Sequence, residues 1–251
     1  MKSTGSESGT AFGVDGCKAG WFCISIEPSG AIGWFVFETL GDLAAMANDG
    51  DRIFVDIPIG LGDGPEERLC DREAMHRLGP GRRSSVFPAP VRAALDARDY
   101  SEAKRISLAA RNQSLSIQSW SILPKIREAD ALLRGSARAQ AIVREVHPEI
   151  CFWALAGENP MRHRKKDRKG IDERIRVLQG VRPSADREFV RICNAVPRTK
   201  VGKDDILDAM AAALTAYGNP SDLRTLPESP PRDACGRPME MVYLPGSALG
   251  K

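Results

Sequence analysis

The chain has 251 residues, of which 42% are apolar, and a formal net charge of +3. These values indicate a globular protein and argue against an intrinsically disordered one. No apolar run approaches the ~20 residues that a helix needs to cross a bilayer, so we expect no membrane segment. The six cysteines form no CxxC or Cys/His cluster, which argues against a zinc site and favours reduced thiols in a cytoplasmic protein.

Residues 1–10 are polar and rich in Gly and Ser, so we predict a disordered tail followed by one domain over residues 11–251. A turn at residues 28–30 makes the second and third strands a hairpin. A right-handed crossover then places the fourth strand parallel to the first, so that their ends lie next to each other. The sequence of this region predicts three strands at 11–14, 21–26 and 32–37, then a helix at 39–48 and a fourth strand at 53–57.

The next part of the chain has no strand pattern and predicts a helical insertion over about residues 62–138 that covers these strand ends. A Gly-Pro-Gly sequence at 79–81 breaks the first of its helices. A fifth strand, at 141–146, lies beside the fourth and completes a mixed α/β sheet of order 3-2-1-4-5. The other predicted elements are helices at 66–78, 91–97, 101–112, 118–133, 171–178, 186–194 and 203–214 and a late strand at 239–243.

Two aspartates stand at the ends of predicted strands one and four. Asp15 closes the run Ala11–Val14, and Asp56 closes the run Ile53–Val55. A charge at the end of a buried strand is costly unless a cation or a hydrogen-bond donor meets it. Because the two strand ends lie side by side and carboxylates are ligands for hard divalent cations, we predict a metal site there.

A third aspartate lies inside an apolar helix. From Ile206 to Leu214, Asp208 is the only polar residue. Asp205 and Asp204 lie three and four residues before it, so all three can share one helix face. Asp204 is explained as a helix cap, but a cap has no use at Asp208. Metal ligation is the favoured explanation of the Asp208 charge, and a buried salt bridge is the alternative.

The order of these elements, with acids on strand one, after strand four and on the closing helix, is that of the ribonuclease H-like fold. The chain also contains, in this order, the motifs VDGCKAGW (14–21), DIPIGL (56–61), RRSSVFP (82–88), EVHPE (145–149) and DDILDA (204–209). With these motifs it resembles a family of uncharacterised proteins described as predicted RNase H-like nucleases (DUF429 type). The closing helix, Asp205–Ala211, is also similar to the Asp-x-x-Asp-Ala-Leu-Ala motif of Holliday-junction resolvases.

This resemblance implies a metal-dependent nuclease that hydrolyses phosphodiester bonds with two Mg²⁺ or Mn²⁺ ions held by carboxylates. In that arrangement Asp15 bridges both ions and Asp56 binds one of them. Asp208 completes the other ion's site, with Asp205 beside it. The four aspartates are therefore the expected catalytic metal ligands.

Glu145, near the end of the fifth strand, is a further candidate catalytic and metal-binding acid. The alternative is a surface residue paired with Arg144 or with a later arginine. Basic residues cluster at 162–169 and could bind a phosphate backbone, with a solvated surface as the alternative. The residues expected to contact substrate phosphates are Lys18, Arg82, Arg83, Ser84, Lys165 and Lys166.

The expected partner is nucleic acid, either DNA or RNA, bound through a local basic groove. A net charge of +3 and an aromatic content of 6% do not predict tight nonspecific binding, and a homodimer is left open. Two other functions are considered. One is a non-catalytic nucleic-acid or nucleotide-binding protein on the same fold. The other is an actin-like or sugar-kinase-like ATP-dependent phosphotransferase, which requires a second, duplicated core.

Overall fold

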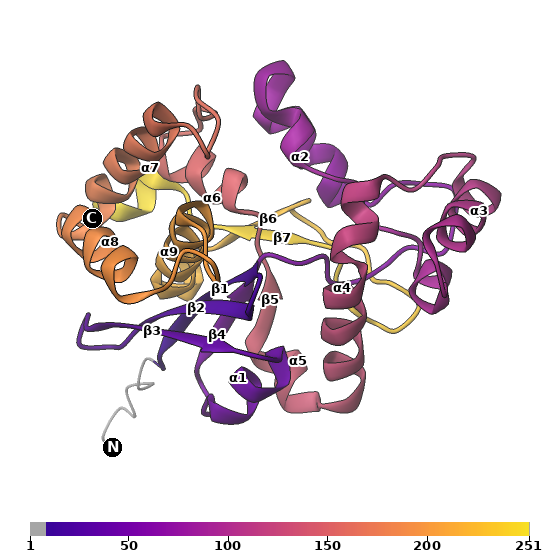
Figure 1. Ribbon diagram of the computed structural model, residues 1–251, viewed down its shortest axis with the longest axis horizontal. Helices are drawn as coiled ribbons and strands as arrows, with labels where there is room; N and C mark the ends of the chain where they lie inside the picture. Colours follow the sequence, from indigo (N-terminus) through magenta and orange to yellow (C-terminus); the bar gives the residue numbers. More distant parts are fainter. Residues whose placement is uncertain (1–8, 251) are drawn as a thin grey trace.

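The structure, a computed structural model that describes residues 9–250, contains a mixed five-stranded sheet with helices on both faces (Figure 1). The strand order is β3-β2-β1-β4-β5, which confirms the predicted order. The β1–β2 and β2–β3 pairs are antiparallel, and the β1–β4 and β4–β5 pairs are parallel. The strands are β1 (Ala11–Cys17), β2 (Gly20–Ile26), β3 (Ile32–Phe37), β4 (Arg52–Val55) and β5 (Val143–Glu145).

Most of the tail predicted over residues 1–10 lies outside the described residues. Thr10 is already tied to the start of the sheet. Its N–H donates to Asp51 Oδ1 at 2.7 Å, and its carbonyl accepts from the Arg52 N–H at 3.0 Å. Within residues 9–250, no helix is both long and apolar enough to cross a membrane.

One face of the sheet is covered by the four helices that follow β5. The last of them, α9, lies directly on β1 and β2, and Figure 1 shows it between the strands and the outer helices. Because α9 is apolar nearly all round from Ile206 to Leu214, it is buried on all sides. Phe22 and Phe54 meet it in the core on this face. The helices are α6 (Pro148–Leu155), α7 (Arg168–Val181), α8 (Ala185–Ala195) and α9 (Lys203–Tyr217).

A second core on the opposite face joins Val14, Trp21 and Val55 to three other helices. The first of these helices is capped by Thr39, whose side chain and that of Asp42 form a reciprocal capping box. Side chains alternate along each strand between the two cores, so the face that a strand residue occupies follows from its position. The helices are α1 (Leu40–Met46), α4 (Ile117–Gly135) and α5 (Ala137–Ile142).

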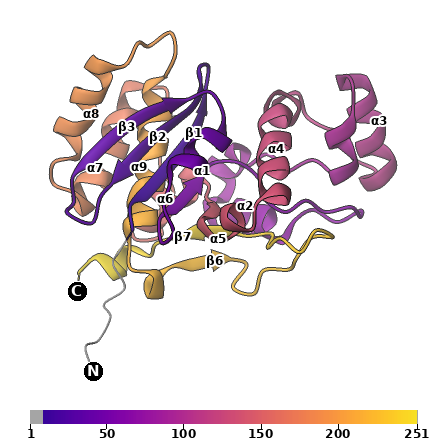
Figure 2. The ribbon, with the colours of Figure 1, turned by 90° about the horizontal axis from the view of Figure 1, so that it is seen from below.

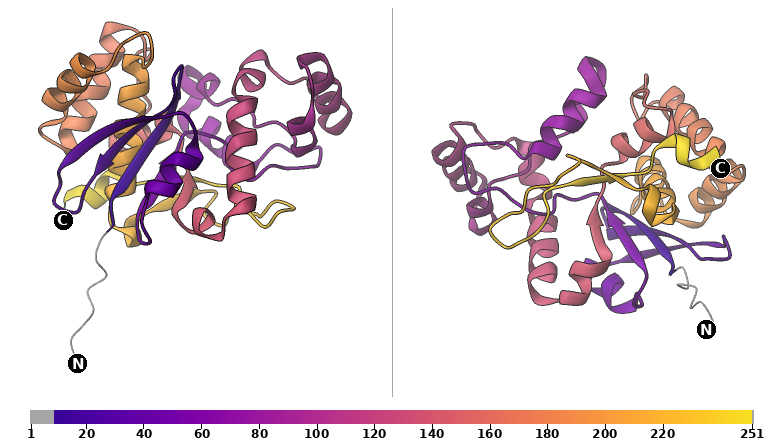
Figure 3. Two further views of the ribbon diagram at one scale, coloured as in Figure 1. Left: turned by 60° about the horizontal axis from the view of Figure 1, so that its bottom comes forward. Right: turned by 180° about the vertical axis from the view of Figure 1, so that it is seen from behind.

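Between β4 and β5 the chain forms α2 (Leu69–Arg82) and α3 (Tyr100–Arg111) before it enters α4 and α5. Gly79, with φ 65°, kinks α2 at the predicted Gly-Pro-Gly break. Figures 2 and 3 show α3 and α4 at the opposite end of the molecule from α7 and α8. The expected helix at 91–97 is a short 3-10 helix, Arg92–Asp96.

The fifth strand is shorter than predicted, because residues 141 and 142 belong to α5. The Ser136 side chain accepts from the Ala139 N–H at 3.1 Å and starts this helix directly after α4. The predicted strand at 239–243 is β7 (Met241–Tyr243), which pairs antiparallel with an unpredicted strand, β6 (Arg224–Leu226). The sequence interpretation also missed α6, whose first residue is a proline.

Candidate metal centre

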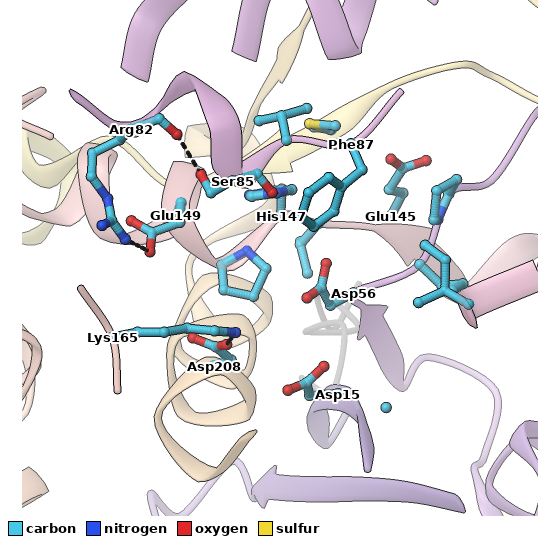
Figure 4. Close-up of a pocket in the computed structure, with 18 of the residues that line it drawn as sticks. Asp15, Asp56, Arg82, Ser85, Phe87, Glu145, His147, Glu149, Lys165 and Asp208 are labelled. Atoms are coloured by element: carbon cyan, nitrogen blue, oxygen red, sulfur yellow. Dashed lines mark hydrogen bonds and ion pairs between the residues drawn. The ribbon is translucent and has the colours of Figure 1, made fainter. Parts of the chain in front are cut away.

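Asp15 and Asp56 occupy neighbouring positions near the carboxyl ends of β1 and β4. The register pairs Val14 with Val55, and the Asp56 N–H donates to the Val14 carbonyl at 2.9 Å. Phe54 belongs to the core under α9. Asp56, two residues further along, therefore points to the same face, and Asp15 beside it does so too. Both carboxylates thus face the region where α9 crosses the strand (Figure 4).

Asp208 reaches this region because α9 approaches β1 closely. Gly13 permits the approach: a Cβ at this position would lie 2.2 Å from the Ala209 carbonyl oxygen and 2.0 Å from the Ala213 nitrogen. Any larger residue would push the helix away from the strand. The neighbour of Ala209 is Asp208, which is 2% exposed and lies next to the two strand-end acids.

The three aspartates are held in a strongly unfavourable electrostatic setting. Burial raises the pKa of Asp15 well above its usual range, and the nearby charges of Asp56 and Asp208 raise it further. Burial also raises the pKa of Asp56, and it raises that of Asp208 to about 6. The carboxylates therefore repel one another in a poorly hydrated space, and a cation placed among them would be stabilised.

The side-chain ammonium of Lys165 lies among these three aspartates. Lys165 Nζ lies 2.6 Å from Asp208 Oδ2, and the same ammonium lowers the pKa of Asp15 and Asp56. Burial alone would lower the pKa of Lys165, but the charges of Asp208 and Asp15 outweigh burial and hold this pKa above its usual value. The residue that the sequence predicts as a phosphate contact thus pairs with a predicted metal ligand.

The acids and Lys165 line a cavity of about 700 Å³. Its walls come from the segment after α2, from α4, from the segment that links β5 to α6, and from the loop before α7. Lys18, Arg83 and Asp205 are not among the lining residues. The predicted site residues that do line the cavity are Asp15, Asp56, Arg82, Ser84, Glu145, Lys165, Lys166 and Asp208.

Asp205 takes the capping role that the sequence interpretation gave to Asp204. The helix begins at Lys203, so its cap residue is Gly202, and the Gly202 N–H donates to Asp205 Oδ2 at 2.8 Å. The prediction for Asp204 is wrong because the helix starts one residue before it. Asp204 instead faces Lys166, at 3.9 Å between Oδ2 and Nζ.

Glu145 lies on the other face of its strand. It shares the face of Val143, which packs in the core opposite α9. There the Glu145 carboxylate accepts from Arg68 Nη2 at 2.6 Å, from Arg68 Nη1 at 2.9 Å and from the Ile59 N–H at 2.6 Å. Burial raises the pKa of Glu145, and the contacts of Arg68 with the ionised carboxylate lower it. The alternative of a surface pair with Arg144 is wrong, since Glu145 is buried and Arg144 pairs with another acid.

Cys70, Asp71 and Glu145 bring three ligand atoms within 4.8 Å of one another, a grouping that could hold a metal ion. Arg68 shares this place. Its Nη2 lies 2.7 Å from Asp71 Oδ1 and 2.6 Å from Glu145 Oε1. Burial raises the pKa of the Cys70 thiol, which disfavours the thiolate that a metal would require. Arg68 thus already supplies the positive charge that the two carboxylates need.

The sequence interpretation did not assign Glu149 to the site. This residue lies in the first turn of α6 and lines the cavity. Its Oε1 is bound by Arg82 at 2.5 Å and by Arg174, whereas its buried Oε2 has no hydrogen-bond partner among the described residues. Its charge raises the pKa of Asp56 and Asp208. The sequence signal that could have identified Glu149 is its position directly after a proline that starts a helix close to a strand end.

The fold and the site define an α/β protein with a cavity of buried carboxylates at the ends of two parallel strands. The chain belongs to the family described as "Protein of unknown function (DUF429)", whose sequence profile matches residues 13–232. The matched region contains the three aspartates of the cavity, Lys165 and Glu149. No curated protein and no solved structure matches the chain.

Proposed function

We propose that this protein is a metal-dependent nuclease with a ribonuclease H-like fold, which hydrolyses phosphodiester bonds of nucleic acid. The observation that carries the proposal is the meeting of Asp15, Asp56 and Asp208 in one cavity, with Lys165 as the ammonium among them. Asp56 and Asp208 raise the pKa of Asp15, and Asp56 also raises that of Asp208, so the three carboxylates form a site of concentrated negative charge. Such a site is suited to a cation of charge two or more.

The residues present fit Mg²⁺ or Mn²⁺. The donors are carboxylate oxygens, which these hard cations prefer. Glu149 Oε2 adds a buried oxygen without a hydrogen-bond partner among the described residues. Asp15, Asp56 and Asp208 would hold the metal. The chemistry that such ions supply when bound is activation of a water and stabilisation of the leaving oxygen in an in-line displacement.

The chain's own basic residues have a separate part in the proposal. Lys165 balances the charge of Asp208 and Asp15 inside the cavity. Arg164 and Lys166, its exposed neighbours, line the same cavity and offer donors to the phosphates on either side of the scissile bond. This arrangement places local positive charge next to the acids on a protein whose net charge is only +3.

The two alternative functions make different demands on the chain. A phosphotransferase of the actin-like type needs a second core, and residues 9–250 hold one five-stranded and one two-stranded sheet. A non-catalytic binding protein would use the same acids and metal without cleavage. The observations favour the nuclease over the phosphotransferase, and a cleavage assay decides between the nuclease and the binding protein.

The test is calorimetric titration of Mn²⁺ into the wild-type protein, Asp15→Asn and Asp204→Asn. Asp204 is the matched control, because it lies near the site on the same helix as Asp208 but does not line the cavity. We expect the wild type and Asp204→Asn to bind Mn²⁺ and Asp15→Asn to lose binding. A screen of single-stranded, duplex and branched DNA and RNA should then show cleavage that Asp15→Asn abolishes. Equal Mn²⁺ binding by all three proteins would contradict the site.

A further inference from the structure

The cavity that holds the acids also has an apolar side that neither metal binding nor phosphate binding explains. Phe87, Pro58 and Ile122 all line it. Phe87 is 42% exposed and, among the described residues, belongs to none of the hydrophobic core clusters. A phenyl ring offers a flat apolar face and no polar atom. Its place in the cavity therefore points to an apolar, planar part of a ligand.

The segment that carries Phe87 is fixed on both sides of the ring. Before it, the Ser85 carbonyl lies 3.3 Å from His147 Nε2. After it, the Ala89 N–H donates to the buried Asp71 Oδ2 at 3.0 Å. Figure 4 shows Phe87 beside Ser85 and His147 with its ring directed into the cavity. The ring is thus presented by a preorganised segment, which lowers the entropy cost of binding a ligand against it.

We propose that Phe87 stacks on an unpaired nucleobase while the adjoining phosphate lies at the aspartates, so that the substrate is single-stranded or locally opened nucleic acid. This inference rests on the proposed nuclease function and names its substrate class. In a duplex both faces of each base are covered by neighbouring bases, so Phe87 can reach a base face only where stacking is interrupted. A cavity of about 700 Å³ is also of the size that encloses one small ligand.

The test measures binding by fluorescence anisotropy of short labelled single strands of DNA and RNA and of the corresponding duplexes. Ca²⁺ replaces Mg²⁺ so that the strands stay intact. The variants are Phe87→Ala, Phe87→Trp and Phe35→Ala. Phe35 is the matched control, since it is 41% exposed but lies on β3 and does not line the cavity. Because both phenylalanines are exposed, their replacement should leave the fold intact, which thermal unfolding checks.

We expect Phe87→Ala to weaken single-strand binding about tenfold, which is the usual range for loss of one aromatic–base stack. Phe87→Trp and Phe35→Ala should bind like the wild type, and duplexes should bind more weakly than single strands. Equal single-strand affinity of Phe87→Ala and the wild type would overturn the inference, as would preferred duplex binding or no strand binding by the wild type. Mn²⁺ titration separates the two proposals, because Phe87→Ala should keep the metal binding that Asp15→Asn loses.

Discussion

Glu145→Gln tests whether this acid is a structural residue or a metal ligand. In the structure its side chain is 3% exposed and pairs with the fully buried Arg68. The substitution keeps the size of the side chain and removes its charge. It also places an amide N–H₂ group where Glu145 now accepts bonds from Arg68 and from the Ile59 N–H. Arg68 would keep only Asp71 as a charged partner.

The expected loss of stability follows from these contacts. Removal of one partner from a buried ion pair typically costs about 3–5 kcal/mol, because the other charge stays buried and uncompensated. Glutamine retains one acceptor oxygen and Arg68 retains Asp71, so we place the loss at the lower end, about 3 kcal/mol. For a chain of this size, this loss lowers the Tm by about 6–12 °C. Mn²⁺ affinity should not change, because Glu145 faces away from α9.

Urea unfolding, thermal unfolding and Mn²⁺ calorimetry on the same samples measure both effects. Glu240→Gln is the matched control, since this buried glutamate pairs with Arg144, whose side chain is 35% exposed. A pair open to solvent is worth about 0–1 kcal/mol, so the control should lose less stability. Unchanged stability of Glu145→Gln together with weakened Mn²⁺ binding would refute the structural role and restore Glu145 as a ligand.

Three further predictions concern the cavity and its support. Lys165→Met should strengthen Mn²⁺ binding and destabilise the metal-free protein, because it removes the cation that now partners Asp208; weaker binding in calorimetry would show that Lys165 assists the metal. Burial raises the pKa of Asp208 from 3.8 to about 6 in the folded protein, so protonation of this carboxyl group stabilises the metal-free protein. The contribution is complete below pH 3.8 and is lost as the pH rises through about 6. Urea unfolding at several pH values should show a weaker pH dependence in Asp208→Asn, and an identical dependence would contradict the shift. Gly13→Ala should cost about 3 kcal/mol of unfolding free energy, since its Cβ would lie 2.2 Å from the Ala209 carbonyl oxygen; unchanged stability would mean that α9 can move away.

The sequence was most informative where local pattern and topology rules act together. Short apolar runs ending in Asp15 and Asp56, together with a right-handed crossover between the strands, were enough to place the two acids side by side. Asp208 could be found because a charge within an apolar helix is costly and therefore stands out. The confirmed strand order rests on the same local signals.

The sequence was least informative where a side chain's role depends on a distant partner or on one residue of register. Glu145 sits in a strand of three residues, and alternation along that strand places it on the same face as Val143, opposite α9. Its partner Arg68 lies 77 positions away along the chain, at the start of the predicted helix 66–78, and a helix pattern does not reveal so distant a contact. The start of α9 one residue before Asp204 moved the capping role to Asp205. Each of these outcomes is set by tertiary packing, which propensities do not encode.

The charges of the cavity also bear on why these acids are there at all. Asp208 is 2% exposed between the buried residues Leu207 and Ala209, a position where an apolar side chain would pack without any cost of burying charge. Lys165 offsets part of that cost, yet Asp15, Asp56 and Asp208 all still have raised pKa values beside it. Arg68, in contrast, forms direct ion pairs with both Asp71 and Glu145 on the other face of the sheet. Among the acids that line the cavity, the three aspartates are therefore left short of positive charge, which is the physical argument for a divalent cation there.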